Sequence, residues 1–284
     1  MRWKHGRRSD NIEDRRGMRV GGRGLAGGSI GAIILALVAV YFGVDPSVVL
    51  NQAGGPTTGQ QTQQAPFSPE EEQLKEFVSV VLADTEDVWG ALFQEAGEQY
   101  RQPRLVLFSG AVESACGFAE AAMGPFYCPS DQNLYLDMSF FSDLAKRHDA
   151  PGDFAQAYVV AHEVGHHVQT LLGISEKVHA ARRRAGAAEG NAMQVKMELQ
   201  ADCFAGVWAH HANQSRQILE PGDIEEALAA AAGVGDDRLQ KQARGYVTPE
   251  SFTHGTSEQR MRWFSTGMQS GDPRRCDTFE AARL

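Results

Sequence analysis

Two histidines four residues apart, with a glutamate beside the first, form the stretch of this sequence best suited to chemistry. It reads His162-Glu163-Val164-Gly165-His166. On a helix, residues four apart share a face, so both imidazoles can reach one metal ion. Zinc accepts neutral imidazole, and a catalytic zinc site has three protein ligands and one open position for water. Glu163 can take a proton from that water as it attacks a carbonyl.

The surroundings of this stretch favour a functional site over a surface helix with incidental histidines. Apolar residues precede it over 157–161 and follow it at Val168, Leu171 and Leu172. Burying two histidines and a carboxylate among apolar side chains is costly without a compensating partner. The sequence therefore predicts one bound Zn²⁺.

The third ligand decides the type of zinc site. The metzincin pattern HExxHxxGxxH is excluded, because position 169 is Gln and position 172 is Leu. A carboxylate from a later helix remains, and Glu198 offers one. Asp202 lies one turn further on the same face, where it can accept a hydrogen bond from a ligand histidine and fix its tautomer. The alternative for both acidic residues is a solvated helix face.

Three other residues are weaker ligand candidates. Glu189 and His179 lie nearby in the sequence, but His179 belongs to a basic stretch typical of solvated surface. His167 points about a third of a turn away from His166. We expect His167 to lie behind the ligands or on the surface.

The stretch 253–260 supplies two candidates for stabilising the negative charge that develops on a carbonyl oxygen during hydrolysis. His254 precedes a predicted helix start, and Arg260 lies about one turn inside that helix. The residues leave open which of the two acts. An ordinary loop and helix start is the equal alternative.

An uncharged run of twenty residues, 25–44, is just long enough to cross a bilayer as a helix. Residues 1–24 carry eight basic and three acidic side chains, so the positive-inside rule places them in the cytoplasm and the rest outside. No small-x-small site follows the run, which favours an uncleaved anchor over a signal peptide. A basic nucleic-acid-binding arm is the weaker alternative for residues 1–24, so we expect no nucleic-acid partner.

Composition divides the chain into four parts. We predict a basic cytoplasmic tail over 1–24, a transmembrane helix over 25–44, and a flexible linker over 45–67 that is rich in Gln, Gly, Thr and Pro. A metallopeptidase domain fills 68–284. It starts with a helix, since Ser68 is suited to be its N-cap.

Inside the domain, strands are predicted over 104–108 and 133–141, and residues 133–136 offer an edge for pairing with a peptide. Helical patterns occupy roughly 152–173, 189–213, a stretch from 223, and 256–267. Thr256 and Gln259 form a possible capping box for the last helix. The expected fold class is α+β: a single-pass anchor, a flexible tether and a mostly helical catalytic domain with a small β-sheet.

The four cysteines fit an exported domain. An even number of cysteines outside the cytoplasm favours disulfides, and no CxxC spacing suggests a cysteine zinc site. Three pairings are possible. We prefer Cys116–Cys128 and Cys203–Cys276.

The chain resembles the bacterial putative neutral zinc metallopeptidase family in five stretches: MRWKHGRRSDNIEDRRG, CGFAEAAMGPFYCPSDQNLYLD, AHEVGHHVQ, ELQADCFAGVWAH and SFTHGTSEQRMRWF. The resemblance implies a single-pass membrane protein with a gluzincin-like catalytic domain. In that domain His162, His166 and Glu198 would bind zinc, and Glu163 would be the general base.

Two further features resemble related families. Gluzincins and the CAAX-prenyl endopeptidase group share a Glu-x-x-x-Asp arrangement that Glu198 and Asp202 reproduce. The latter group also has a Thr-His segment followed by an arginine, similar to Thr253, His254 and Arg260. This resemblance favours a transition-state role for His254.

The expected function is that of a zinc metalloendopeptidase in the bacterial cytoplasmic membrane, with its catalytic domain outside, periplasmic or extracellular. Its partners would be a peptide or protein substrate and the lipid bilayer around residues 25–44. The alternative is a non-catalytic, zinc-stabilised, membrane-tethered binding or adaptor protein. Glu163 argues for the enzyme, because metal retention alone does not require that carboxylate.

Overall fold

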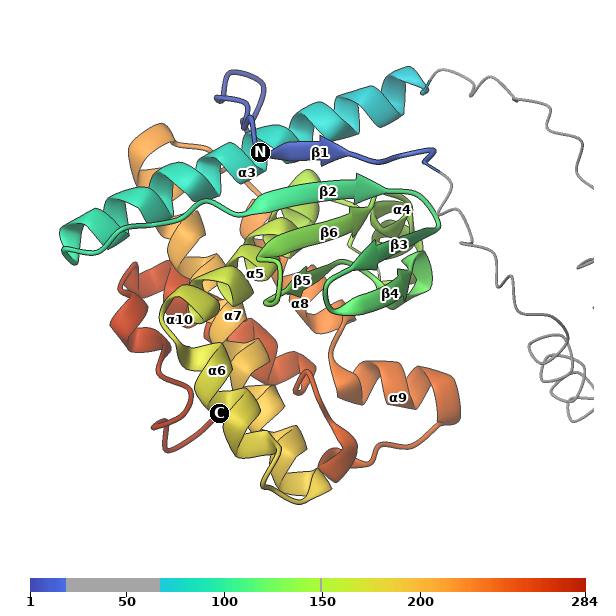
Figure 1. Cartoon of the computed structure of the whole chain (residues 1–284), viewed down its shortest axis with the longest axis vertical. Helices are drawn as coiled ribbons and strands as arrows, with labels where there is room; N and C mark the ends of the chain where they lie inside the picture. Colours follow the sequence, from blue (N-terminus) through green and yellow to red (C-terminus); the bar gives the residue numbers. More distant parts are fainter. Residues whose placement is uncertain (19–66, 149) are drawn as a thin grey trace, which may run out of the picture. The chain divides into compact units, whose positions relative to one another are not determined.

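The computed structural model describes residues 1–18, 67–148 and 150–284. They form a mostly helical α+β fold with a small mixed sheet (Figure 1). The predicted membrane helix (25–44) and almost all of the predicted linker (45–67) lie outside these residues. Within the described part of the chain, no helix has the length and apolar character needed to cross a bilayer.

The main sheet has four strands in the order β1-β2-β6-β5. The first three, β1 (Ile12–Asp14), β2 (Arg104–Phe108) and β6 (Asn133–Asp137), are parallel. β5 (Phe126–Cys128) pairs antiparallel with β6 and forms one edge. β2 and β6 are buried along almost their whole length, which explains why their sequences are continuous apolar runs.

A separate hairpin, β3 (Ala111–Ser114) and β4 (Gly117–Glu120), precedes the edge strand. A short 3₁₀ turn, η1 (Ala121–Met123), connects it to β5.

The strand predicted over 133–141 is too long. β6 ends at Asp137, whose carboxylate accepts hydrogen bonds from the backbone of Gly110 (2.6 Å) and Ser139 (2.9 Å). The chain then turns into helix α4 (Ser139–Arg147). Edge pairing of a peptide with residues 133–136 is also excluded, because β6 lies between β2 and β5.

The helices account for most of the domain. The N-cap predicted at Ser68 and the capping box predicted at Thr256/Gln259 are both present, and Ser68 also forms a capping box with Glu71. The remaining helices are α3 (Pro69–Glu95), α5 (Asp153–Leu171), α6 (Ile174–Arg182), α7 (Ala187–Arg216), α8 (Asp223–Gly233), α9 (Asp236–Arg244) and α10 (Ser257–Ser270), with 3₁₀ turns η2 (Pro249–Ser251) and η3 (Pro273–Cys276).

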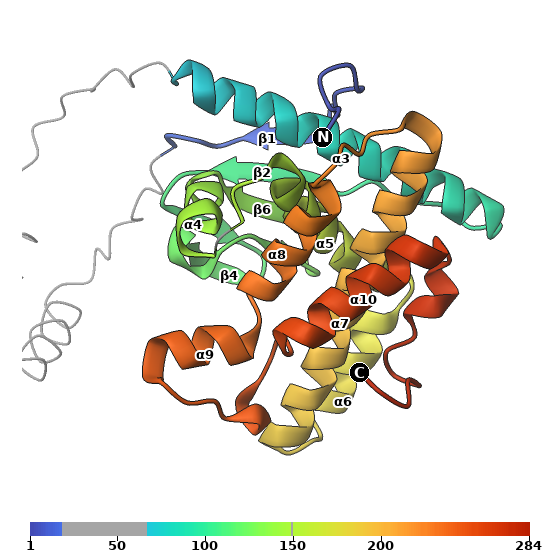
Figure 2. The ribbon, with the colours of Figure 1, turned by 180° about the vertical axis from the view of Figure 1, so that it is seen from behind.

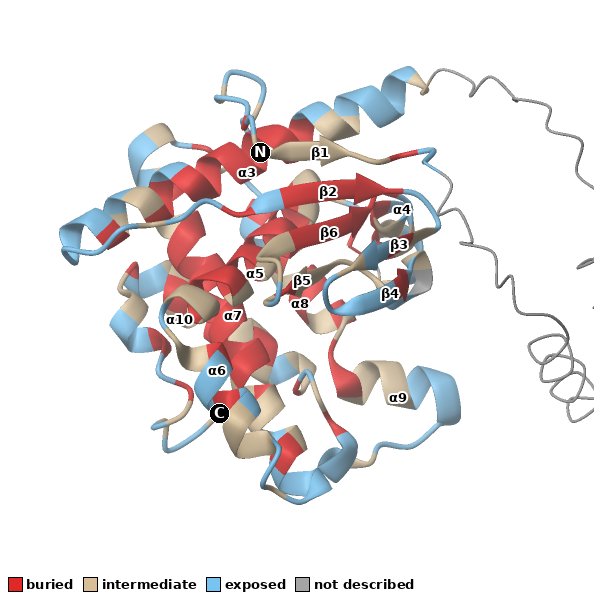
Figure 3. Ribbon diagram, viewed as in Figure 1, coloured by how far each residue is buried: buried red, intermediate tan, exposed pale blue. Residues whose placement is uncertain are grey.

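Glycines set the spacing of the helices that carry the predicted site. A Cβ at Gly165 of α5 would lie 3.0 Å from the carbonyl oxygen of Ala201 in α7. Between α7 and α10 the approach is closer, since a Cβ at Gly267 would lie 1.9 Å from the carbonyl oxygen of Cys203. Figures 2 and 3 show α5, α7 and α10 together, with their contacting faces buried.

Both preferred cysteine pairings are confirmed as disulfides. Cys116–Cys128 joins the turn of the β3–β4 hairpin to β5. Cys203–Cys276 joins α7 to η3.

The N-terminal residues require a correction. We predicted a separate basic tail over 1–24, but residues 1–18 belong to the same compact unit as residues 67–284. Ile12 to Asp14 form β1, in register with Leu105 to Leu107 of β2. The amino group of Met1 lies 2.6 Å from Asp153 at the start of α5. The sequence shows the basic charges but not the acidic partners, which lie far away along the chain.

Candidate metal centre

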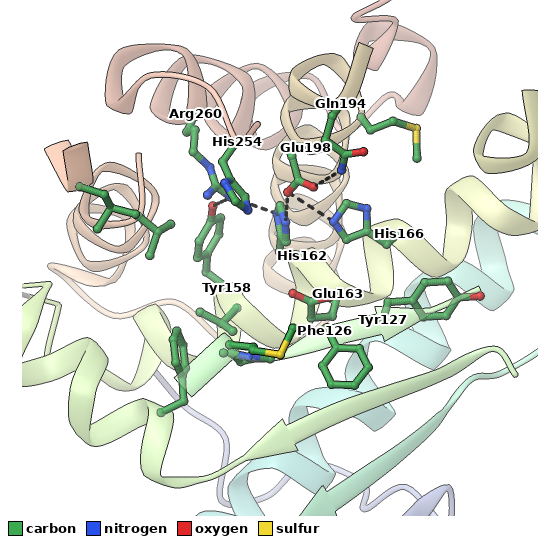
Figure 4. Close-up of a pocket in the computed structure, with 18 of the residues that line it drawn as sticks. Phe126, Tyr127, Tyr158, His162, Glu163, His166, Gln194, Glu198, His254 and Arg260 are labelled. Atoms are coloured by element: carbon green, nitrogen blue, oxygen red, sulfur yellow. Dashed lines mark hydrogen bonds and ion pairs between the residues drawn. The ribbon is translucent and has the colours of Figure 1, made fainter. Parts of the chain in front are cut away.

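Two neighbouring helices bring the three predicted metal ligands together. His162 and His166 lie one turn apart on α5, and Glu198 faces them from α7 (Figure 4). The Nε2 atoms of His162 and His166 lie 3.1 and 3.5 Å from Oε2 of Glu198. All three potential ligand atoms fall within 4.8 Å of one another.

Each of these side chains is held by a second residue. Nδ1 of His162 lies 2.8 Å from Oδ1 of Asp202, as the sequence predicts. Nδ1 of His166 lies 2.8 Å from Oε1 of Gln169. Because both Nδ1 atoms face oxygen acceptors, each carries the proton and leaves Nε2 free to bind a metal ion.

The carboxylate of Glu198 is oriented in the same way. Nε2 of Gln194 donates to Oε1 at 2.7 Å, which turns Oε2 toward the imidazoles. Arg182 of α6 donates in turn to the side-chain oxygen of Gln194. Two imidazole nitrogens and one carboxylate oxygen, each held by a further hydrogen bond, are a donor set that suits zinc.

The charges of the site favour a cation. Burial lowers the pKa of His162, but the Asp202 and Glu198 carboxylates together outweigh that effect and raise it to about 9. Burial raises the pKa of Glu198, but the charge of His166 and the hydrogen bond from His162 bring it well below its usual range. Protons on the two histidines thus balance the buried carboxylates when no metal ion does.

Arg260 lines the same cleft as the three ligands, but its guanidinium is engaged by Asp202. It is 3% exposed, and it donates from Nε and Nη2 to the two oxygens of Asp202, both at 2.8 Å. Nη2 also reaches the hydroxyl of Tyr158, which donates to Asp202. Arg260 therefore holds Asp202, the residue that orients His162. The sequence could not reveal this burial.

His254 is the other predicted candidate, and it lies at the cleft with about half of its side chain exposed. Asp236 at the start of α9 holds it. One Asp236 oxygen accepts the backbone N–H groups of Thr253, His254 and Gly255 at 2.7, 2.6 and 3.0 Å. The other lies 3.3 Å from Nδ1 of His254.

Glu163 and the edge strand border one cleft of about 950 Å³. Glu163 is partly exposed and, in the view of Figure 4, lies between His162 and Phe126 of β5. Apolar side chains on the β5 and α4 side, including Met123 and Phe140, line the cleft. The arrangement places a base, a candidate metal site and the terminal strand of the sheet at one opening.

The weaker candidates are also placed. His167 is buried behind the ligands, with Nε2 at 2.6 Å from the Arg101 carbonyl, and burial lowers its pKa to about 4. Its Nδ1 lies 3.1 Å from the hydroxyl of Tyr127, which links α5 to β5. His179 lines the cleft but is not in the ligand cluster, and exposed Glu189 lies in the first turn of α7.

Four residues that support the site were not predicted from the sequence. Gln169, Gln194 and Tyr158 lie three or four residues from a ligand on the same helix, so helical spacing could have identified them. Asp236 had no such signal.

A second acidic group, Asp153, Asp223 and Glu226, also has cation-binding spacing. The amino group of Met1 lies there, 2.6 Å from Asp153 and 3.4 Å from Asp223, and supplies its positive charge.

Comparison with known proteins gives a consistent result. Residues 1–279 match the family model described as "Putative neutral zinc metallopeptidase". The chain is 52% identical over 287 residues to "Uncharacterized protein YpfJ" of Escherichia coli (strain K12), covering 98% of this chain and 99% of that protein. It is 43% identical over 258 residues to "Uncharacterized protein Rv2575" of Mycobacterium tuberculosis (strain ATCC 25618 / H37Rv), covering 87% and 86%. No solved structure matches.

Proposed function

The chain belongs to the putative neutral zinc metallopeptidase family, and we propose that it is a zinc metalloendopeptidase of gluzincin type. The observation that carries the proposal is the convergence of His162, His166 and Glu198 next to Glu163, at a cleft that a strand edge borders. A purely structural zinc site would have four protein ligands and would not need a carboxylate beside them.

Each residue has a role in this mechanism. His162, His166 and Glu198 hold the zinc, whose chemistry is to polarise a carbonyl and lower the pKa of water. Glu163 accepts a proton from the attacking water and later gives it to the leaving amine. These transfers need Glu163 to reach both the water and the amine, and its partly exposed place in the cleft allows this.

His254 is the residue we assign to the oxyanion. Its Nδ1 faces Asp236, so Nε2 is free to donate a hydrogen bond toward the cleft once that nitrogen carries a proton. Arg260 takes no direct part, because it is buried against Asp202.

The substrate backbone would pair with β5, the sheet edge that lines the cleft. An extended peptide added to a strand edge gains backbone hydrogen bonds whatever its side chains are. This suits an endopeptidase that acts on unfolded segments. The two disulfides support an oxidising compartment outside the cytoplasm for the domain.

Glu163→Gln tests the proposal in the full chain. Hydrolysis of unfolded casein should fall by at least 100-fold while one zinc per chain remains bound, because the amide cannot accept the proton. Glu176→Gln is the matched control: it removes an exposed glutamate from α6, outside the cleft lining, and should leave hydrolysis unchanged.

Two results would contradict the enzyme. Glu163→Gln could cleave casein as fast as the wild type, or the zinc-loaded wild type could cleave no peptide. The second result would favour the adaptor alternative.

A further inference from the structure

Residues 1–18 are a built-in part of the metal-binding domain. β1 supplies one edge of the four-stranded sheet, with three residues in parallel register on β2. The backbone N–H of Arg15 continues the pairing, at 2.7 Å from the carbonyl oxygen of Leu107. Strand pairing of this kind requires β1 and β2 to be in one compartment.

Three arginines of this segment form ion pairs with α3. Arg7 lies 2.7 Å from both Glu86 and Asp87, and Arg8 forms an ion pair with Glu76. The positive-inside rule reads such arginines as free charges that stay in the cytoplasm. Here acidic side chains of the folded domain neutralise them, so their number says little about orientation.

The chain leaves the domain after residue 18 and re-enters it at residue 67, and these two points lie close together. The guanidinium of Arg16 lies 3.9 Å from the ring centroid of Phe67 and 2.7 Å from Glu72. Lys75 lies 2.8 Å from Asp14. Whatever residues 19–66 do between these points, they leave one folded unit and return to it.

We infer that residues 1–18 and the metal centre lie on the same side of any membrane that the intervening residues enter. A segment that leaves a folded body and returns to the same body makes an even number of complete crossings. The orientation expected from the sequence, with residues 1–24 inside and 68–284 outside, would require β1 to leave the sheet. This inference does not depend on the proposed peptidase activity.

A cross-link inside cells tests the inference. Arg8→Cys and Glu76→Cys put one thiol at each end of an exposed ion pair, and both native disulfides lie on the C-terminal side of residue 66. A site for a specific protease, inserted between Thr58 and Gly59 of the full chain, allows the two fragments to be separated after denaturation. Before extraction, intact cells are treated with a membrane-permeant bis-maleimide whose linker contains a disulfide, because cysteine side chains at these positions are too short to reach each other directly.

The double variant should give fragments that stay joined without reductant and separate with it. The single variants Arg8→Cys and Glu76→Cys are controls, in which the fragments should separate under both conditions. The inference would be overturned if the fragments of the double variant separate without reductant and only one of the two thiols described below reacts in intact spheroplasts.

That second measurement uses Lys4→Cys and Lys241→Cys, two exposed positions in residues 1–18 and in α9. A membrane-impermeant maleimide is applied to intact and to lysed spheroplasts, with the wild type measured in parallel. We expect both thiols to react before lysis, or both only after it. Reaction of only one of them in intact spheroplasts would place the two regions on opposite sides and overturn the inference.

Discussion

Arg260→Met is the substitution that best separates two roles for this arginine. The sequence offered Arg260 as one of two candidates for stabilising the oxyanion, whereas the structure buries it against both oxygens of Asp202. Methionine has a similar length and no charge. Among the described side chains, the substitution leaves Asp202, which is 0% exposed, with Tyr158 and His162 as its hydrogen-bond partners.

The structure sets the expected size of the effect. Removing one partner of a buried ion pair costs about 3–5 kcal/mol, because the other charge remains buried without compensation. Asp202 also orients His162, and the loss of such support weakens metal binding by about 10- to 100-fold. We therefore expect lower stability and lower zinc affinity together.

Urea unfolding of the metal-free protein and competition for zinc with a chelator measure the two quantities. Arg260→Lys keeps the charge but not the forked geometry, and it should cost only about 1.5–3 kcal/mol, the value of a hydrogen bond to a charged group. The double variant Arg260→Met/Asp202→Asn should recover part of the stability, since no unpaired charge remains.

The opposite pattern would refute this reasoning. If Arg260→Met unfolds within about 0.5 kcal/mol of the wild type and binds zinc equally well, Asp202 does not depend on it. A large loss of hydrolysis in such a variant would return Arg260 to the oxyanion role.

Three further predictions follow from the same geometry. The free energy of unfolding of the metal-free protein should fall as the pH rises from about 6.5 through 9. The pKa of His162 is about 6.5 in the unfolded chain and is raised to about 9 in the folded protein, so the stability that protonated His162 contributes is complete below pH 6.5 and lost above pH 9. Unfolding of His162→Gln protein that depends equally on pH in this range would contradict this prediction. Zinc binding at pH 7.5 should release about one proton from His162, whose pKa is raised to about 9, and a further fraction from His166, whose pKa is also raised. Calorimetry in buffers of different ionisation enthalpy measures this number, and release of less than half a proton would refute the prediction. Gly267→Ala should destabilise the protein by more than about 1 kcal/mol in urea unfolding, because the added Cβ would meet the α7 backbone. The control Gly190→Ala has open space around the added Cβ and should stabilise the helix by about 0.5–1 kcal/mol. Equal effects of the two substitutions would show that α7 and α10 can separate freely.

The sequence predicted those parts of the site that depend on spacing within one helix. His162, Glu163 and His166 share a turn of α5, and Glu198 and Asp202 share a turn of α7. Gln169 and Gln194 also lie three or four residues from a ligand on the same helix, so the same spacing could have predicted their contacts.

Contacts between separate elements were not predictable in this way. Local spacing does not tell which helix packs on which, so the contact of Arg260 with Asp202 could not be seen, nor that of Asp236 with His254. For the same reason β1 was taken as part of a basic tail. Its partner strand lies about ninety residues further along the chain.

The hydrogen-bond network around Asp202 bears on the order in which the protein is assembled. Tyr158 and His162 from α5 and Arg260 from α10 meet this carboxylate of α7, and none of these contacts requires a metal ion. Zinc fingers are assembled around their ion, whereas these helices are joined by hydrogen bonds between side chains of the protein itself. Assembly of α5, α7 and α10 should therefore tolerate a low zinc supply better than assembly of a zinc finger does.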